Sequence, residues 1–386
     1  MLQTVATGVA AALLVPGLVT STHLGVLAGA SLRFRERLPK GDVPPIRFLV
    51  VIPAHNEEQM LGDTLRAINT ARRERDQVLV VDDRSRDRTS EIAKAHGALV
   101  LRRNPGEEPG RAAARQAAVE YSAALEWDAM VMIDADSVVE PGFFDLCERM
   151  CATGSEVFQA RSEAQHGDSL LDQVALASFA LQGVTIPRGR AALRLPVRLR
   201  GTGMIMRRNI VRRMSFHAKA GEDLQASLDL LRDGIRPAHL DAARLRSANA
   251  GSWGTATTQK LRYESGRSAA ARAYVPGLFR TRTWAGLEAA WFLLSPPFAT
   301  AAGLLGIGAA LALVGGAVPL AVAGGLGVAL LAFSLSVGAV QARLDRRFLL
   351  ALLAAPGYVT WKLAVQLRAI VGLRRGLREF GPTARS

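Results

Sequence analysis

The chain has 386 residues and a formal net charge of +14; 49% of its residues are hydrophobic and 21% are charged. This length allows one large domain or two modest ones, and the apolar content excludes an intrinsically disordered chain. The two cysteines, Cys147 and Cys151, exclude a disulfide scaffold and are too few ligands for a zinc site. An excess of basic residues is typical of proteins that bind nucleic acid, anionic substrates or the cytoplasmic face of a membrane. The distribution of the apolar residues along the chain distinguishes between these partners.

The N-terminal segment 1–32 contains no Asp, Glu, Lys or Arg. A transmembrane helix needs roughly 20 apolar residues, and this run is too long for the apolar core of a signal peptide. We therefore predict an N-terminal transmembrane helix. Three basic residues follow it at once: Arg33, Arg35 and Arg37. Because positive charge stays on the inner side of a membrane, the chain is expected to enter the cytoplasm at this point.

A second stretch without charged residues runs from Ala289 to Ala342. It is long enough for two spans, at 297–314 and 320–340, and glycines with a proline mark the turn between them. Basic and aromatic residues lie just before this stretch and include Trp284. They predict an interfacial helix at the membrane surface.

The last apolar run, 348–373, allows two interpretations. A full span would place the basic tail 374–386 outside the cell, against the usual distribution of positive charge. A re-entrant or interfacial helix would keep the tail in the cytoplasm, and we favour this second interpretation. Region 284–373 is thus predicted to hold the interfacial helix and the C-terminal transmembrane segments.

The region between the membrane segments, 39–283, has the size of one domain, which is cytoplasmic in this topology. Short apolar runs that predict strands alternate in it with segments of helical spacing. The strands are expected at 48–52, 78–81, 98–101 and 129–133, and the helices at 57–72, 87–95 and 110–125. This alternation predicts an α/β fold with a mostly parallel sheet and right-handed crossovers.

Polar residues follow three of the predicted strands. They form the segments Pro53-Ala-His-Asn-Glu57, Asp82-Asp-Arg-Ser85 and Asp134-Ala-Asp-Ser137. Ligands of such sheets bind beyond the carboxyl ends of the strands, where these carboxylates would converge. Paired carboxylates suit a hard cation such as Mg²⁺ or Mn²⁺, which can bridge protein to diphosphate. Turn capping could explain one acidic segment, but it does not account for three strand ends at once.

Together the three segments resemble the signature of the family-two inverting glycosyltransferases, which have the GT-A fold. The resemblance implies a nucleotide-sugar-binding domain flanked by transmembrane helices, with a UDP-sugar as the expected donor. It implies that Asp82 and Asp83 contact the uridine. It further implies that Asp134 contacts the donor and that Asp136 holds Mg²⁺ or Mn²⁺. The other donor-binding positions in this part of the match are Ala54, Asn56, Glu57 and Arg111.

Arg111 and Arg115 lie in Pro109-Gly-Arg-Ala-Ala-Ala-Arg115, which resembles a basic segment near the donor. The alternative interpretation for both arginines is a solvated helix face. The sequence pattern leaves the two interpretations equally open.

Gly221-Glu-Asp-Leu224 opens a further predicted helix, which ends at Gly234. A carboxylate at a helix start is stabilised by the helix dipole, so capping alone could explain this acidic pair. The resembled family carries its general base in such a pair, after a Gly-rich segment like Gly201-Thr-Gly-Met204. On that resemblance Asp223 deprotonates the acceptor hydroxyl and Glu222 lies on the acceptor side. One base without a covalent nucleophile predicts a single displacement with inversion.

Gln259-Lys-Leu-Arg262-Tyr263 resembles the Gln-x-x-Arg-Trp motif of membrane-embedded cellulose, hyaluronan and chitin-oligomer synthases. The resemblance implies that Gln259 and Arg262 contact the donor and that Tyr263 faces the acceptor sugar. Tyr in place of Trp keeps an aromatic face but leaves processivity open. A plain amphipathic helix is the alternative interpretation.

The expected function is therefore that of an integral membrane glycosyltransferase of the inner or plasma membrane, active in cell-envelope or exopolysaccharide synthesis. Its expected partners are a nucleotide-sugar donor, a lipid-linked or growing glycan acceptor, the lipid bilayer, and polysaccharide-export or assembly proteins. Nucleic acid is not expected, because much of the basic charge lies beside membrane segments. Single addition is favoured over a processive polysaccharide synthase. The alternatives of another class are a nucleotidyltransferase and a non-catalytic basic membrane scaffold.

Overall fold

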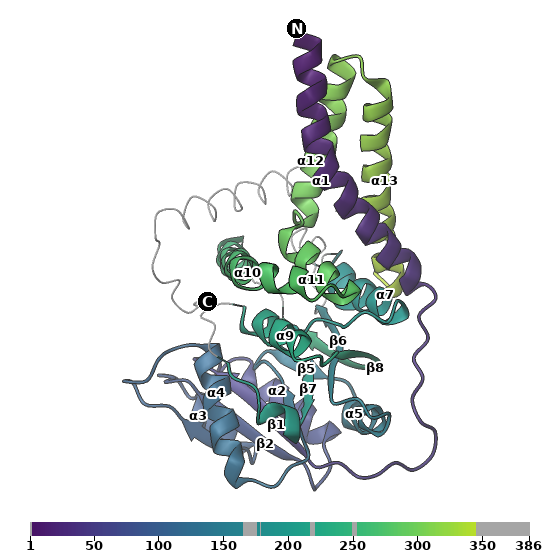
Figure 1. The fold of residues 1–386 in the computed structure, drawn as a ribbon. Coiled ribbons are helices and arrows are strands. Elements are labelled where there is room, and N and C mark those ends of the chain that lie inside the picture. Colours follow the sequence, from purple (N-terminus) through teal and green to yellow (C-terminus); the bar gives the residue numbers. More distant parts are fainter. Residues whose placement is uncertain (1, 165–175, 178, 217–220, 249–252, 345–386) are drawn as a thin grey trace. The chain divides into compact units, whose positions relative to one another are not determined.

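The computed structural model describes residues 2–164, 176–177, 179–216, 221–248 and 253–344, without the side chains of 253–260 and 262. Contacts between Cα atoms divide the chain into two units, and each is described by itself (Figure 1). The sheet unit consists of Arg35–Gln165 and Leu195–Asn249. The helical unit consists of Met1–Phe34, His166–Arg194 and Ala250–Ser386. The domain limits at 39 and 283 stay a prediction, and part of that range groups with the apolar helices.

One eight-stranded sheet forms the sheet unit, in the order β3-β2-β1-β4-β7-β6-β8-β5. The strands are β1 (Phe48–Ala54), β2 (Gln77–Asp82), β3 (Leu99–Arg102), β4 (Ala129–Met132), β5 (Ser137–Val139), β6 (Val157–Ala164), β7 (Met204–Arg207) and β8 (Ala238–Ser247). The first four are mutually parallel, with Val50 opposite Val78 and Phe48 opposite Ala129. β7 runs antiparallel between β4 and β6, and β5 runs antiparallel to β8. The predicted α/β fold with a mostly parallel sheet is confirmed, and the antiparallel strands extend it.

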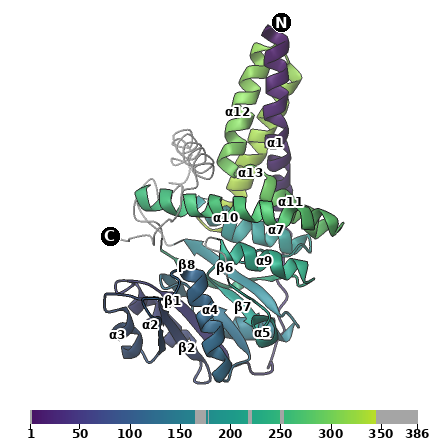
Figure 2. The same ribbon diagram turned by 60° about the vertical axis from the view of Figure 1, so that its left-hand side comes forward.

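Helices cover both faces of this sheet, because alternate residues of each strand point to opposite sides. Phe48, Val50 and Ile52 of β1 pack in one core with α2 and α5. Leu49 and Val51 face a second core with α4 and α9 (Figure 2). Burial on both faces explains why β1 is a continuous apolar run. The helices of this unit are α2 (Leu61–Ala71), α3 (Thr89–Ala95), α4 (Arg111–Tyr121), α5 (Phe143–Ala152), α8 (Arg208–Val211) and α9 (Glu222–Arg232).

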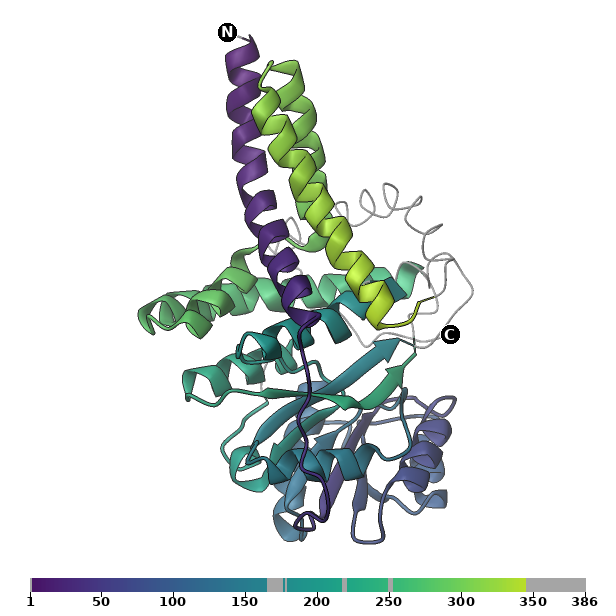
Figure 3. The same cartoon turned by 90° about the vertical axis from the view of Figure 1, so that its right-hand side faces the viewer.

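Three apolar helices run side by side in the helical unit (Figure 3). They are α1 (Leu2–Ser31), α12 (Phe298–Val314) and α13 (Val318–Gln341), close to the predicted spans. Among the described residues, α1 and α13 are each long and apolar enough to cross a membrane. α12 passes the same test only together with α11 (Trp284–Leu294), at a bend of 71° between them. The run 348–373 and the tail 374–386 lie outside the described residues.

Glycines allow the three apolar helices to approach closely. A Cβ added at Gly17 of α1 would lie 2.7 Å from Cγ of Leu305 in α12. A Cβ added at Gly308 of α12 would lie 2.8 Å from Cγ of Leu14 in α1. Small residues at such contacts are typical of helices that pack within lipid, where no hydrophobic effect drives association.

α7 (Ile186–Ala192), in the connection between β6 and β7, belongs to the helical unit and packs against α1. A Cβ added at Gly189 would lie 2.2 Å from the carbonyl oxygen of Leu27, so only glycine permits this approach. Arg190 forms a buried ion pair with Glu288 of α11, and Oε1 of Glu288 lies 3.3 Å from Nε2 of His23 in α1. The other helices of this unit are η2 (Leu181–Thr185) and α10 (Trp253–Arg280).

Candidate active site

The loops after β1 and β2 are tied together by hydrogen bonds. The buried carboxylate of Asp82 accepts the N–H of Ser85 at 2.7 Å, and the Ser85 hydroxyl accepts the N–H of Asn56 at 3.0 Å. Asn56 has a φ of +54°, a left-handed conformation that Asn tolerates better than most residues. The N–H of Glu57 donates to the hydroxyl of Thr89 at 2.9 Å. Asp82 therefore shapes this edge, and its contact with a nucleotide base stays a prediction.

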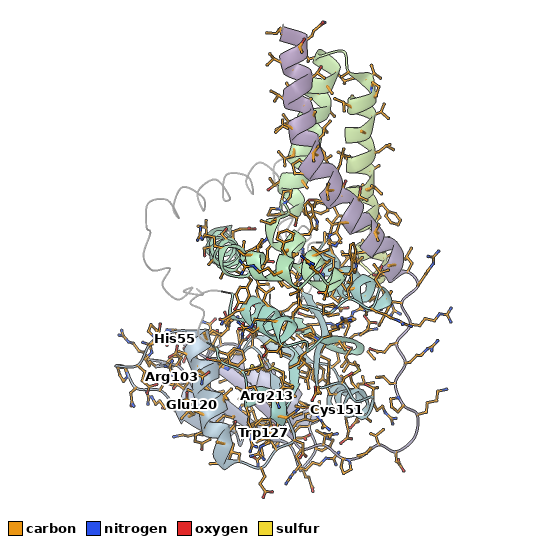
Figure 4. The ribbon with its side chains drawn as sticks, viewed as in Figure 1. His55, Arg103, Glu120, Trp127, Cys151 and Arg213 are labelled. Atoms are coloured by element: carbon orange, nitrogen blue, oxygen red, sulfur yellow. The ribbon has the colours of Figure 1, made fainter. Side chains whose placement is uncertain are left out.

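Asp83 fixes the loop that leads from β3 into α4. The carbonyl of Ala54 accepts the N–H of Asp83 at 2.8 Å. Its carboxylate accepts Nη1–H of Arg103 at 2.7 Å through Oδ1 and the N–H of Gly110 at 2.8 Å through Oδ2. His55 approaches the Asp83 carbonyl with Nδ1 at 2.6 Å, and both His55 and Arg103 are labelled in Figure 4. Asp83 thus sets where α4 begins, beside its predicted role toward the donor.

The end of β4 carries the two carboxylates of the Asp-x-Asp segment. The N–H of Asp134 donates to the hydroxyl of Thr202 at 3.1 Å. That hydroxyl donates to Ser137 Oγ at 3.1 Å, and the Ser137 hydroxyl lies 3.5 Å from Oδ1 of Asp136. The loop before β7 therefore holds both carboxylates in place.

Arg111, the first residue of α4, forms an ion pair with one of these carboxylates. Its Nη1 is 3.2 Å from Oδ2 of Asp134, and its side chain is 42% exposed. Asp134 is the main reason why the pKa of Arg111 lies above its ordinary value, and three more carboxylates act in the same direction against burial. These are Glu222, Asp136 and Asp223. Carboxylates after β4 and at the start of α9 thus act electrostatically on one guanidinium, and Asp134 is in direct contact with it.

The acidic pair at the start of α9 follows Gly221, as predicted. Oδ1 of Asp223 accepts the N–H of Leu224 at 2.8 Å. Burial raises the pKa of Asp223, and the neighbouring Glu222 raises it further, against the opposing effects of Arg115, the Leu224 N–H and Arg111. A carboxylate with a raised pKa accepts a proton from a hydroxyl more readily than an ordinary one. Asp223 therefore has the environment that a general base needs, and the role itself stays a prediction.

Arg115 connects the two groups of carboxylates. Its side chain is 0% exposed, which excludes the solvated helix face for this residue. Nη1 donates to Oε1 of Glu222 at 3.0 Å, and Nη2 donates to the carbonyl of Gly201 at 2.5 Å. Nη2 also lies 3.3 Å from Oδ1 of Asp134. The loop before β7 is also close to Asp223. A Cβ added at Gly201, whose φ is +81°, would lie 3.6 Å from Oδ2 of Asp223.

The charges of the site suit a divalent cation. Four carboxylates face two guanidinium groups, which leaves two more negative than positive charges. Among the described residues, no three His, Cys, Asp or Glu side chains are grouped as metal ligands. Asp134 and Asp136 offer carboxylate oxygens, the ligands that an ion such as Mg²⁺ prefers, and such an ion takes one or two protein carboxylates and completes its shell with phosphate oxygens and water.

The Gln-x-x-Arg-Tyr segment lies on α10, in the helical unit. The side chains of Gln259 and Arg262 lie outside the described residues, and that of Tyr263 is 42% exposed. Their predicted contacts with donor and acceptor stay predictions.

Two residues that shape the site were not singled out by the sequence pattern. Arg103 follows the third strand and binds Asp83, so the rule applied to the other strand ends would have found it. Gln159 is 1% exposed in β6; its Nε2 donates to the Thr202 carbonyl at 2.8 Å, and its Oε1 accepts the Arg200 N–H at 2.9 Å. A polar residue in a strand gives no such signal in the sequence alone.

A solved structure shares this fold, and a second one shows a weaker similarity. The mannosyltransferase PcManGT from Pyrobaculum calidifontis, solved with GDP-Man and Mn²⁺, is 16% identical, with a TM-score of 0.54 over 90% of this chain and 100% of that one. Glucosyl-3-phosphoglycerate synthase from Mycobacterium tuberculosis, solved with Mn²⁺, UDP and glucosyl-3-phosphoglycerate, is 19% identical, with a TM-score of 0.43 over 61% of this chain and 84% of that one.

Sequence comparison places the chain in a family. An uncharacterised protein of Methanocaldococcus jannaschii is 51% identical over 53 residues, which are 14% of this chain. The alignment spans 21% of that relative's length. The family described as "Glycosyltransferase like family 2" matches residues 44–266, more than half of the chain. The chain therefore belongs to glycosyltransferase family 2.

Proposed function

We propose that this protein is a membrane-bound glycosyltransferase that moves a sugar from a nucleotide-sugar donor, with inversion, to a lipid-linked or growing glycan acceptor. The observation that carries the proposal is the linked set of ion pairs in which Arg111 and Arg115 contact Asp134 and Arg115 contacts Glu222, in a chain of family 2. The solved mannosyltransferase of the same fold was obtained with GDP-Man and Mn²⁺, which supports a nucleotide sugar as donor and a divalent cation as cofactor.

Asp223 supplies the base in this proposal. It accepts the proton of the acceptor hydroxyl while the hydroxyl oxygen bonds to the anomeric carbon. The bond from that carbon to the diphosphate breaks on the opposite face, so the configuration inverts. General-base assistance of this kind is worth a factor of roughly 10² to 10⁴. The raised pKa of Asp223 brings it closer to that of an efficient base.

Arg111 and the Asp-x-Asp segment act on the departing nucleotide. The half-exposed guanidinium of Arg111 can pair with the negative charge that develops on the diphosphate, and it is already in place before the reaction. Asp136, with Asp134 beside it, would hold Mg²⁺ or Mn²⁺. Such an ion, when bound, neutralises part of the diphosphate charge.

The apolar helices place the reaction at a membrane in this proposal. Large apolar side chains are exposed on α1 and α13, as lipid contact requires; Val5, Val15, Val318 and Leu326 are each more than half exposed. α10 lies across the direction of α1, α12 and α13, and Trp284 at the start of α11 is 72% exposed (Figure 2). An aromatic side chain in that position suits the membrane–water interface. A lipid-linked acceptor would reach the enzyme in the same plane.

The test is a donor screen with the purified protein in lipid nanodiscs. UDP- and GDP-sugars are offered with lipid extracts as acceptors, and the lipid products are analysed by mass spectrometry. A product heavier by one sugar supports single addition, and a ladder of masses supports processive synthesis. Release of pyrophosphate from a nucleoside triphosphate and a sugar phosphate, with no transfer from any nucleotide sugar, would show a nucleotidyltransferase instead.

A further inference from the structure

We propose that Arg115 is a positioning residue that holds the base-bearing end of α9 at a fixed place relative to the donor-binding end of β4. The proposal rests on the proposed glycosyl transfer, because it assigns Arg115 a role in that reaction. In this proposal the residue acts through Asp223 and Asp134 and not directly on a substrate.

The three hydrogen-bond partners of Arg115 come from three segments far apart in the chain. Glu222 is the first residue of α9, Gly201 lies in the loop before β7, and Asp134 follows β4. The guanidinium group contacts all three from a completely buried position on α4. A planar group with several fixed donors is suited to bridging three acceptors at once, whereas a lysine ammonium acts as a point charge.

The two ends of this bridge differ in how they depend on Arg115. Asp134 has a second guanidinium partner, since Arg111 reaches Oδ2 while Arg115 reaches Oδ1. Among the described residues, Glu222 forms its ion pair with Arg115, while Arg111 acts on it only electrostatically. Loss of Arg115 is therefore expected to release the start of α9, with Asp223, more than it releases Asp134.

This difference predicts a specific kinetic signature. Asp134 keeps its place through Arg111, so donor affinity should change little. Asp223 loses its fixed distance to the anomeric carbon, and a misplacement of about 1 Å can cost roughly 100-fold in rate. The turnover number should therefore fall much more than donor binding weakens.

The experiment compares Arg115→Lys with Arg208→Lys in the full chain. Arg208 offers a matched control, since its guanidinium donates to the carbonyls of Trp127 at 3.4 Å and Leu125 at 3.3 Å, in the same unit but outside the site (Figure 4 labels Trp127). Donor affinity, kcat and hydrogen exchange of peptides covering 221–232 are measured for both variants. We expect a fall in kcat of roughly 10- to 100-fold and faster exchange at the start of α9 for Arg115→Lys alone.

Arg115→Met adds a second variant, which removes the charge and keeps the side-chain length. It should lower kcat further than Arg115→Lys, because lysine retains one of the three contacts.

Unchanged exchange at 221–232 in Arg115→Lys would overturn the proposal, as would a kcat equal to that of the wild type. Loss of donor binding in parallel with kcat would also overturn it, because Arg115 would then serve the donor directly. If the wild type transfers no sugar from any donor, the proposed function fails, and the exchange measurement still decides whether Arg115 holds α9.

Discussion

Asp223 is the residue on which the proposed chemistry depends most. Replacement by Asn keeps the side-chain oxygen that accepts the Leu224 N–H at 2.8 Å, so the start of α9 should stay folded. Asn does not accept the proton of the acceptor hydroxyl. We expect Asp223→Asn to lower kcat by roughly 10² to 10⁴ while the melting temperature and donor affinity stay close to wild type.

The turnover number and the donor affinity of this variant each exclude a different alternative. A variant with normal turnover would remove Asp223 from the mechanism. A variant that also fails to bind donor would show that the residue shapes the site, and the base would have to be sought elsewhere.

The raised pKa of Asp223 predicts the acid side of the pH–rate profile. The base is inactive when protonated, so kcat/KM should fall as the pH drops through its pKa, above the ordinary Asp value of about 3.9. Glu222 raises this pKa through its negative charge, so Glu222→Gln should lower it and move the acid limb to lower pH. An acid limb that does not move, or moves upward, would contradict this assignment.

The proposed role of Asp136 as a metal ligand predicts that sugar transfer depends on a divalent cation. EDTA should abolish transfer, and added Mn²⁺ or Mg²⁺ should restore it in the wild type but not in Asp136→Asn, which lacks the charged ligand. Asp63→Asn, on the exposed face of α2, is the control and should respond like the wild type. Full activity of the wild type in EDTA would rule out a metal requirement.

The residues of the site differ in how well their positions could be predicted from the sequence. Asp82, Asp134 and Asp136 follow short apolar runs, and strand geometry alone places them at one sheet edge. Arg115 follows three alanines on a helix, where a solvated face and a buried contact look alike. Its burial depends on Gly201 and Glu222, 86 and 107 residues further along the chain.

Among the elements, those with local signals were predicted well. β1 to β4 and the helices between them lie within a few residues of the expected ranges, because apolar runs and helical spacing define them. The four later strands, β5 to β8, were not expected. β6 contains Gln159, Arg161 and Glu163, so its pattern is not that of an apolar strand. It forms a strand because it pairs with β7 and β8, and such long-range pairing is not visible in one short segment.

The close contact between α7 and α1 predicts that a larger side chain at Gly189 destabilises the protein. Gly189→Ala would place a methyl group against the Leu27 carbonyl, and backbone atoms on both sides must move apart. We expect a loss of about 1–3 kcal/mol in stability, seen as a lower melting temperature in detergent or nanodiscs.

Gly29→Ala is the matched control for that change. Gly29 lies on α1 with no atom within 4 Å of an added Cβ. Alanine there should be neutral or slightly stabilising, by up to about 1 kcal/mol. If both variants melt alike, the close approach of α7 does not contribute to stability.

For the whole molecule, the positive residues after α1 predict a cytoplasmic sheet unit and an external turn between α12 and α13. An impermeant thiol reagent in intact cells should label Val318→Cys, which is exposed at the start of α13, but not Arg213→Cys, on the surface of the sheet unit (Figure 4). The native cysteines give little background, since burial raises the pKa of Cys147 and raises that of Cys151 to about 11. Labelling of Arg213→Cys before lysis would reverse the orientation.

The position of β7 and β8 in the sheet has a consequence for the order of events during synthesis. β4 pairs with β1 but lacks its second neighbour until β7 is made, and the sheet is complete only when β8 pairs with β6 and β5. β8 ends more than two hundred residues after α1 does, which corresponds to roughly 10–40 s at ribosomal speed. α1 is therefore ready to enter a bilayer long before the catalytic sheet can close, while its helical partners α12 and α13 are translated last. The nascent chain would be anchored before it is folded, so the unfinished sheet edge would spend that interval close to the membrane surface.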